Sequence, residues 1–180
     1  MIGSHNTMTY LPVKRWYMKL FNCIAKCQDL NLIQQYNYGV RLFDLRISYN
    51  KYGIPEFAHG LVKYKGDVLH TLKYINTYFK GCTVRIILES EKNNGVKLFR
   101  DNVLDWINFF NNITFIQGNS KKNWNKIVNL PDFTGPQYVS SMCGKGLARI
   151  FPRLYAYLYN SVNKELTTTE YLIDFIGKYD

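Results

Sequence analysis

The sequence predicts an α/β fold in which helices alternate with strands that run mainly parallel. Three observations predict it. Residues 39–47 have a period of two, with one face made of Val40, Leu42, Asp44 and Arg46 and the other of Arg41, Phe43, Leu45 and Ile47. Residues 83–90 form a β-branched run typical of a buried strand, and amphipathic helices are expected at 67–79 and 96–110. This alternation along a chain is typical of βα repeats around a parallel sheet.

The remaining elements follow in order from local signals. A strand of residues 1–3 opens the chain, and a short amphipathic helix near 30–36 ends at Gly39, which suits a helix C-terminus. Asp67 is expected to cap the helix that it begins. Listed along the chain, the other expected segments are a turn at 50–55, strands at 56–60 and 113–118, a loop-rich region at 120–137, a helix at 147–162 with Pro152 inside or at its edge, and a strand at 171–177.

Composition limits the class of protein. The 180 residues are 47% hydrophobic and 20% charged, which excludes disordered, collagen-like and coiled-coil chains and predicts one domain over residues 1–180. The chain has 23 Lys+Arg and 13 Asp+Glu, a net charge of +10. This excess favours an anionic partner, namely nucleic acid, an anionic membrane or a phosphate-bearing substrate, unless it serves solubility alone.

The four cysteines, Cys23, Cys27, Cys82 and Cys143, lack the paired spacing of a zinc site, so we expect small apolar fillers. No apolar run reaches the roughly 18 residues of a membrane span, and residues 1–10 are too polar for a signal peptide. We therefore expect a soluble monomer without a signal peptide, cytoplasmic or released, that acts at a membrane surface.

The polar residues that could carry chemistry lie near the ends of the expected strands. In chain order they are His5, Asp44, Arg46, His59 and Glu89, with Asp174 inside the last strand. Because the carboxyl ends of parallel barrel strands form one functional face, we expect these side chains to meet. The third histidine, His70, lies within a helix and has no polar company.

Two histidines at one bond can act as general base and general acid, because each imidazole has an ordinary pKa of about 6.5. Cleavage of a phosphodiester by an internal hydroxyl needs such a pair, here His5 and His59, and a cation such as Arg46 to offset phosphate charge. Asp44 and Asp174 are candidates to orient an imidazole. The structural alternative is a loop His5, a core His59 and an Asp44–Arg46 ion pair within the sheet.

Five motifs carry a family resemblance. They are G-S-H-N-T at 3–7, K-C-Q at 26–28, G-V-R-L-F-D-L-R-I-S at 39–48, A-H-G at 58–60 and V-R-I-I-L-E-S at 84–90. Together they resemble, in order and spacing, the catalytic X-domain of phosphatidylinositol-specific phospholipase C, most closely the bacterial type. H-N-T or H-G alone would be a weak signal, but the joint occurrence of the five motifs, which span about half the chain, is specific.

The resemblance implies a small, distorted TIM-like (β/α) barrel with trimmed or missing elements, since such barrels usually take about 250 residues. It also implies that His5 is the general base on the inositol 2-hydroxyl and His59 the general acid for the diacylglycerol oxygen. The products would be diacylglycerol and inositol 1,2-cyclic phosphate. Asp174, in L-I-D-F-I, is similar to the late-strand aspartate that partners the first histidine in bacterial members.

The superfamily divides on metal use. Asn6, Asp44 and Glu89 match the calcium-dependent branch, but Arg46 stands where a second acidic ligand is expected, as in metal-independent bacterial enzymes. A guanidinium there would repel Ca²⁺, so we expect no metal and no cofactor, with Ca²⁺ on Asn6, Asp44 and Glu89 as the alternative. Without a metal, Asn6, Glu89 and Arg85 would contact the substrate, and Glu89 could instead pair with Arg46 or Arg85.

The expected partners are a phospholipid substrate and, peripherally, an anionic membrane surface. Two basic aromatic segments, 13–21 and 148–159, suit that surface unless they pack on the barrel. No nucleic-acid partner is expected. Two alternatives stay open: a glycerophosphodiester phosphodiesterase, whose E-N-T element is absent from this sequence, and a non-catalytic module that binds phospholipid head groups or nucleic acid.

Overall fold

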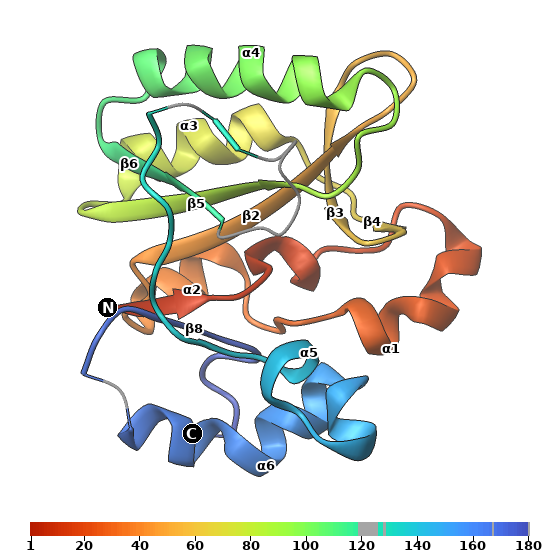
Figure 1. Ribbon diagram of the computed structural model, residues 1–180, viewed down its shortest axis with the longest axis vertical. Coiled ribbons are helices and arrows are strands. Elements are labelled where there is room, and N and C mark those ends of the chain that lie inside the picture. Colours follow the sequence, from red (N-terminus) through yellow and green to blue (C-terminus); the bar gives the residue numbers. More distant parts are fainter. Residues whose placement is uncertain (119–125, 128, 167, 180) are drawn as a thin grey trace.

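The computed structural model describes residues 1–118, 126–127, 129–166 and 168–179. Much of the loop expected at 120–137 falls on residues 119–125 and 128, which lie outside the described residues. The described part is an α/β structure built on one mixed sheet, and the expectation of an α/β fold is confirmed (Figure 1).

The sheet consists mainly of parallel strands. Its strands are β1 (Ile2–Ser4), β2 (Leu42–Tyr49), β3 (Pro55–His59), β4 (Val62–Lys63), β5 (Cys82–Leu88), β6 (Ile113–Gln117), β7 (Gln137–Tyr138) and β8 (Tyr171–Ile173). In space, β7, β8, β1, β2, β5 and β6 follow one another with every pairing parallel. Within the described residues β6 and β7 do not pair, so this small barrel-like sheet remains open there.

The strand expected at 56–60 is present as β3, but it runs antiparallel to β2. The expectation of parallel strands is therefore wrong for this strand. A turn of a few residues cannot join parallel strands, which need a crossover of about a dozen residues or more. β3 therefore folds back along the same edge of β2 that β1 uses further down, because β5 occupies the opposite edge. Because Phe57 pairs with Ile47, the residues that follow Phe57 run back along β2 toward the end of β1. His59 is one of these residues.

Six α-helices connect the strands of the sheet within the described residues. They are α1 (Asn22–Ala25), α2 (Leu32–Asn37), α3 (Val68–Tyr78), α4 (Gly95–Phe109), α5 (Ser140–Cys143) and α6 (Pro152–Glu165), with short 3-10 turns at Thr7–Tyr10, Trp16–Phe21 and Gly146–Arg149. Figure 1 shows α3 and α4 together at one end of the molecule and α5 and α6 at the other. The Asp67 carboxylate accepts a hydrogen bond from the His70 backbone amide at 2.8 Å, as the predicted cap requires.

Two expected elements near the C-terminus have different bounds. The helix predicted at 147–162 begins only at Pro152, because proline lacks the amide hydrogen that an interior position needs and suits the first helical turn. The last strand ends at Ile173, four residues earlier than expected. Phe175 adopts a left-handed φ of 51° and its amide bonds to the Cys27 carbonyl, which turns the chain away from the sheet. Asp174 thus lies just beyond the strand.

A continuous apolar core joins the sheet to the helices on its α3 and α4 side. Phe99, Val103 and Trp106 of α4 are buried in it, together with Val84 and Ile86 of β5. The expectation that the cysteines fill apolar space holds for Cys27 and Cys82, which are buried. It is wrong for Cys23 and Cys143, which are exposed, because α1 and α5 are short surface helices.

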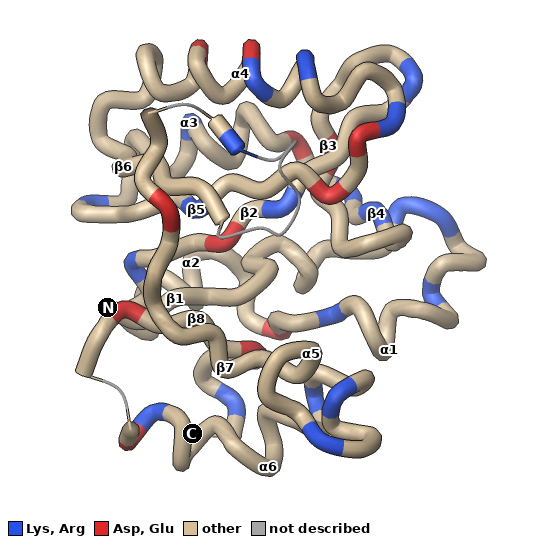
Figure 2. Tube along the Cα trace, in the orientation of Figure 1, with Lys and Arg blue, Asp and Glu red and all other residues tan. Residues whose placement is uncertain are grey.

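The segment of residues 13–26, which we call the basic arm, lies at one edge of the molecule (Figure 1). No acidic residue occurs among the first 28 residues, whereas Lys14, Arg15, Lys19 and Lys26 lie in the arm (Figure 2). Trp16 and Leu20 each expose 80% of their surface. No helix within the described ranges is long and apolar enough to cross a membrane.

We predict that Gly3→Ala destabilises the fold. A Cβ at position 3 would lie 2.5 Å from the Tyr171 carbonyl oxygen and under 3 Å from the Leu172 and Leu42 side chains, so β1 could not keep its place between β2 and β8. Overpacking of this kind costs about 1–3 kcal/mol. Chemical denaturation measures the free energy of unfolding, and Thr77→Ala on the exposed side of α3 is the control. Equal stability of the two variants would contradict the prediction.

Candidate functional site

His5 lies directly after β1 and is held between a carboxylate and a guanidinium. Its Nδ1 atom lies 2.6 Å from Asp174 Oδ1, and its Nε2 atom lies 2.8 Å from Arg46 Nη2. A guanidinium can only donate hydrogen bonds, so His5 Nε2 accepts and the ring proton lies on Nδ1. His5 is therefore arranged as a neutral imidazole with its lone pair on the Arg46 side, and the predicted pairing with Asp174 is present.

A set of hydrogen bonds fixes the end of β1 against the end of β8. The His5 amide donates to the Ile173 carbonyl at 3.0 Å, and Gln28 Nε2 donates to the carbonyls of both residues at 3.0 Å. The Asp174 carboxylate also accepts from the Ser140 amide at 3.3 Å. β1 has only three residues, and its end is held by contacts with Gln28, with the end of β8 and, through Asp174, with Ser140. These contacts position His5.

Asp44 is the fully buried carboxylate at the centre of the site. It accepts hydrogen bonds from the Asn6 amide at 3.0 Å, from Arg46 Nε at 3.0 Å and from Arg85 Nη1 at 3.2 Å. Burial alone would raise the pKa of Asp44, but the two guanidinium groups and the amide hold this pKa below its ordinary value. Asp44 is therefore a fixed negative charge that orients Arg46.

Glu89 follows β5 and completes the surroundings of Arg46. Arg46 Nη1 donates to Glu89 Oε1 at 3.1 Å, and the Gly60 amide donates to Oε2 at 3.3 Å. Burial disfavours the charge of Arg46, but Asp44 and Glu89 outweigh it and raise the pKa of the guanidinium. Of the two pairings considered for Glu89, the structure contains the one with Arg46.

These residues do not fit a divalent cation. Ca²⁺ takes six to eight oxygen ligands, yet both oxygens of Asp44 and both oxygens of Glu89 already accept hydrogen bonds from nitrogen donors. The Arg46 guanidinium bridges the two carboxylates, in the position where a cation would be needed. Of the alternative ligand set Asn6, Asp44 and Glu89, the two carboxylates are thus both bonded to Arg46.

His59 lies opposite His5, with ring centroids 6.0 Å apart and planes at 87°. Its Nδ1 atom donates to the Ala25 carbonyl at 2.7 Å, which leaves Nε2 as the nitrogen that can exchange a proton with a ligand. Burial, together with the positive charge of Arg46 and the proximity of His5, lowers the pKa of His59 to about 4. Without a ligand, His59 is therefore neutral at neutral pH.

Cys27 contacts this pair, which sequence reasoning missed. It is fully buried, and its Sγ lies 3.7 Å from His59 Nδ1. Its Sγ also belongs to a group of donor atoms, with His5 and Asp174, that lie within 4.8 Å of one another. Burial and the Asp174 charge raise the pKa of Cys27, so it remains a neutral thiol that packs beside His59 and close to His5 and Asp174. Its place in the K-C-Q motif was the one available signal.

Two other predicted residues lie at the edge of the group. Arg85 is 3% exposed and lies behind Asp44, where Nη1 also donates to Gln137 Oε1 at 3.2 Å. Asn6 is equally buried and adopts a left-handed φ of 50°. Its Nδ2 atom has no hydrogen-bond partner among the described residues, so it remains available as a donor within the site.

An apolar cavity of about 300 Å³ adjoins His59. Its wall comes from the basic arm, through Met18, Phe21 and Ile24, and from the turn between β3 and β4, through Leu61. The imidazole of His59 thus has a charged side, toward Arg46 and Glu89, and an apolar side.

Comparison with known protein families finds no match, and comparison with curated protein sequences finds none either. Solved structures do match. The phosphatidylinositol-specific phospholipase C from Listeria monocytogenes aligns over 97% of this chain and 87% of its own, with a TM-score of 0.61 and 15% identity. A mutant of the phosphatidylinositol-specific phospholipase C from Staphylococcus aureus aligns over 98% and 85%, with a TM-score of 0.68 and 16% identity. The chain thus has the fold of these bacterial proteins, and the expected distorted TIM-like barrel is confirmed.

We predict that nuclear magnetic resonance titration of His59 gives a pKa of about 4, and that Arg46→Gln raises it, because a positive charge is removed. Since this pKa lies below the unfolded value of about 6.5, the unfolded state binds the proton first. His59 therefore stabilises the fold above pH 6.5, and this contribution is lost as pH falls toward 4. Arg100→Gln on the exposed face of α4 is the control. A His59 pKa near 6.5 in the unsubstituted protein would refute the prediction.

Proposed function

We propose that the protein cleaves phosphatidylinositol-type lipids to diacylglycerol and inositol 1,2-cyclic phosphate, and that residues 1–180 act as one catalytic domain. One observation carries the proposal: two imidazoles, 6.0 Å apart, share a site with a guanidinium that lies 2.8 Å from one of them. These are the groups needed for attack of a neighbouring hydroxyl on the phosphorus of a phosphodiester: a base, an acid and a cation that stabilises the phosphate charge. The similarly folded bacterial proteins are phosphatidylinositol-specific phospholipases C by name, which supports the substrate class.

In the first half of the reaction, His5 Nε2 takes the proton of the inositol 2-hydroxyl, and that oxygen forms a bond to phosphorus. The Asp174 carboxylate, 2.6 Å from Nδ1, stabilises the imidazolium that results. Arg46 turns Nη2 from His5 toward a non-bridging phosphate oxygen, while its other nitrogens keep their carboxylate partners. A permanently charged, oriented guanidinium thus offsets the charge that grows on phosphate.

In the second half, the bond from phosphorus to the diacylglycerol oxygen breaks, and that oxygen takes a proton from His59 Nε2. The unliganded His59 is neutral, because its pKa is lowered to about 4. The negative phosphodiester favours the imidazolium and raises this pKa. His59 therefore takes up a proton from solvent when substrate binds and donates that proton to the leaving oxygen. The backbone bond from Nδ1 to Ala25 holds the ring in this tautomer.

The proposed reaction uses no metal. Arg46 supplies the positive charge, and the oxygens of Asp44 and Glu89 are engaged by nitrogen donors. Asn6 Nδ2, a buried donor without a partner in the described part of the chain, is the candidate contact to the inositol ring or the phosphate.

The substrate is proposed to reach the site from an anionic membrane. The apolar cavity beside His59 would take the glycerol end of the leaving group. The exposed Leu61 lines this cavity, and the basic arm that forms its wall also carries the exposed Trp16 and Leu20. Aromatic and aliphatic side chains interleaved with lysine and arginine suit the membrane interface. The basic arm is the stronger candidate for contact, because its Trp16 and Leu20 each expose 80% of their surface. Ion pairs do not separate the two segments, since Arg153 of the second and Lys26 of the arm both pair with Asp29, at 2.8 and 2.9 Å.

We expect His5→Ala and His59→Ala each to lower the release of diacylglycerol from phosphatidylinositol micelles by about 10²–10⁴-fold, because each removes a proton-transfer group. The assay contains EDTA, and the unsubstituted protein should keep its full rate. His70→Ala, on exposed α3, is the matched control and should leave the rate unchanged.

Full activity in either active-site variant would exclude the proposed roles, and loss of activity in EDTA would exclude the metal-free reaction. If the unsubstituted protein binds phosphatidylinositol vesicles without releasing diacylglycerol, the head-group-binding alternative is supported instead.

We expect the double variant Trp16→Ala/Leu20→Ala to reduce turnover of vesicle substrate about tenfold, because two apolar side chains no longer enter the interface. Its rate on a soluble, short-chain substrate should stay unchanged. Leu69→Ala/Tyr78→Ala on α3 removes comparable exposed apolar surface elsewhere and serves as the control. Equal loss on both substrates would indicate damage to the site rather than to membrane contact.

A further inference from the structure

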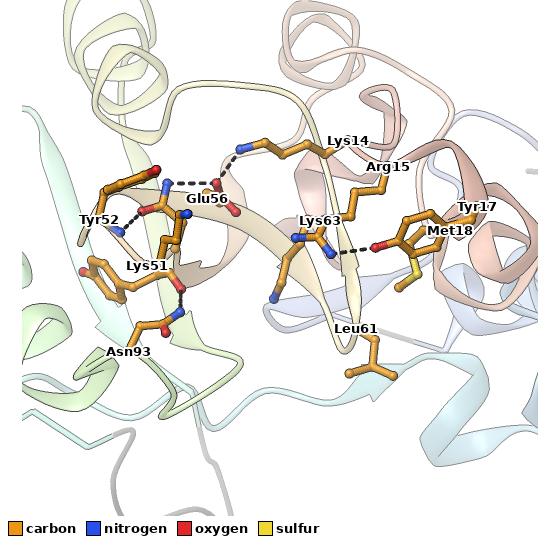
Figure 3. Close-up of a pocket in the computed structure, with 12 residues that line it drawn as sticks. Lys14, Arg15, Tyr17, Met18, Lys51, Tyr52, Glu56, Leu61, Lys63 and Asn93 are labelled. Atoms are coloured by element: carbon orange, nitrogen blue, oxygen red, sulfur yellow. Dashed lines mark hydrogen bonds and ion pairs between the residues drawn. The ribbon is translucent and has the colours of Figure 1, made fainter.

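A second cavity, of about 440 Å³, lies between the basic arm and the turns of the β2–β3 and β3–β4 hairpins (Figure 3). Four cationic side chains line it: Lys14, Arg15, Lys51 and Lys63. Glu56 is the one carboxylate among the described lining residues. His5, Arg46 and Glu89 do not line it, so this cavity is separate from the catalytic group.

The cations approach the cavity from two sides. In Figure 3, Lys51 and Tyr52 lie on one side, and Arg15, Lys63 and Tyr17 lie on the other. Arg15 Nη1 donates to the Tyr17 hydroxyl at 2.6 Å, and Lys51 Nζ lies 4.9 Å from the centre of the Tyr52 ring. These contacts position the charges without neutralising them, and Glu56, which pairs with Lys14, offsets one of them.

Lys63 adds a second indication that an anion belongs here. It lies on β4, where burial lowers the pKa of its ammonium group, and Lys92 lowers it further, although Glu89 and Glu56 oppose this. A desolvated cation in a wall of like charges is stabilised by any anion that enters the cavity. The cavity therefore holds more positive charge than its own carboxylate can satisfy.

The surroundings identify the kind of anion. Met18 and Leu61 line both this cavity and the apolar cavity beside His59, and Leu61 exposes 82% of its surface on the turn between them. An extended nucleic acid would need a cationic stripe along an open groove. A single cationic cavity with an apolar rim instead fits a phosphate head group whose acyl chains continue along apolar side chains.

We propose that this cavity binds the head group of a second anionic phospholipid, one that is not cleaved, and so holds the protein on the membrane beside its substrate. The inference rests on the proposed function only in placing the protein at a lipid surface. Binding of a lipid without an inositol ring involves no turnover, so it can fail or succeed independently of catalysis.

The test is sedimentation of the protein with vesicles of phosphatidylcholine that contain phosphatidylglycerol, at physiological salt. Lys51→Ala/Lys63→Ala should weaken this binding about tenfold and leave turnover of a soluble, short-chain phosphatidylinositol unchanged. Lys73→Ala/Lys80→Ala on and after α3 removes the same charge from exposed positions outside the cavity, and it should weaken binding less than twofold. Equal weakening in both variants means diffuse attraction to the membrane and overturns the proposal.

A second measurement does not depend on how the variants fold. Monomeric, short-chain phosphatidylglycerol titrated into the unsubstituted protein should shift the amide resonances of residues 14–18, 49–52 and 61–63 with saturation at one equivalent. Inorganic phosphate at the same concentrations should shift them less, because it cannot use the apolar rim. Shifts confined to residues around His5 and His59, or no saturation, would refute a separate head-group site.

Discussion

The buried charge of Asp44 is the constraint on which the site depends. A carboxylate in the middle of a sheet stays ionised only where donors and cations surround it, and Asp44 obtains them from β2 itself, from β5 and from the turn after β1. Its partners are fixed in return. Arg46 is held so that its remaining nitrogens reach His5 and Glu89, and the turn that carries His5 is tied down through the Asn6 amide.

Hydrogen bonds from distant segments also explain how a short chain can hold the His5 imidazole in place. β1 is too short to anchor His5 by itself, so β8, Gln28 and the residues after β8 share the task. Because β1 and β8 are neighbours in the sheet, Asp174 lies beside His5 although the two are 169 residues apart in the sequence. Although β6 and β7 do not pair within the described residues, Gln137 of β7 accepts a hydrogen bond from Arg85 of β5, and the Ser140 amide after β7 donates to Asp174. Side-chain contacts thus hold the candidate site together beside the open edge.

Positive charges and exposed apolar side chains occur together along one edge of the molecule. The basic arm carries cations and exposed apolar residues together, and its side chains contribute to both cavities beside the β3–β4 turn. One cavity is apolar and adjoins His59, whereas the other is cationic and is not lined by His5, Arg46 or Glu89. In the proposed function, the first receives the diacylglycerol part of the substrate, and in the further inference the second receives a neighbouring anionic lipid.

Local patterns in the sequence determined much of this. Periodicity indicated β2, β5, α3 and α4, since each depends on neighbours close in sequence, and the motifs indicated His5, Asp44, Arg46 and Asp174 as one group. Only the tertiary structure decided that β3 runs antiparallel, that Cys27 packs beside His59 and that Ser140 supports Asp174. It alone decided the lowered pKa of His59. The reason is physical: burial and electrostatic shifts depend on distances between groups far apart in the chain, and no local pattern encodes those distances.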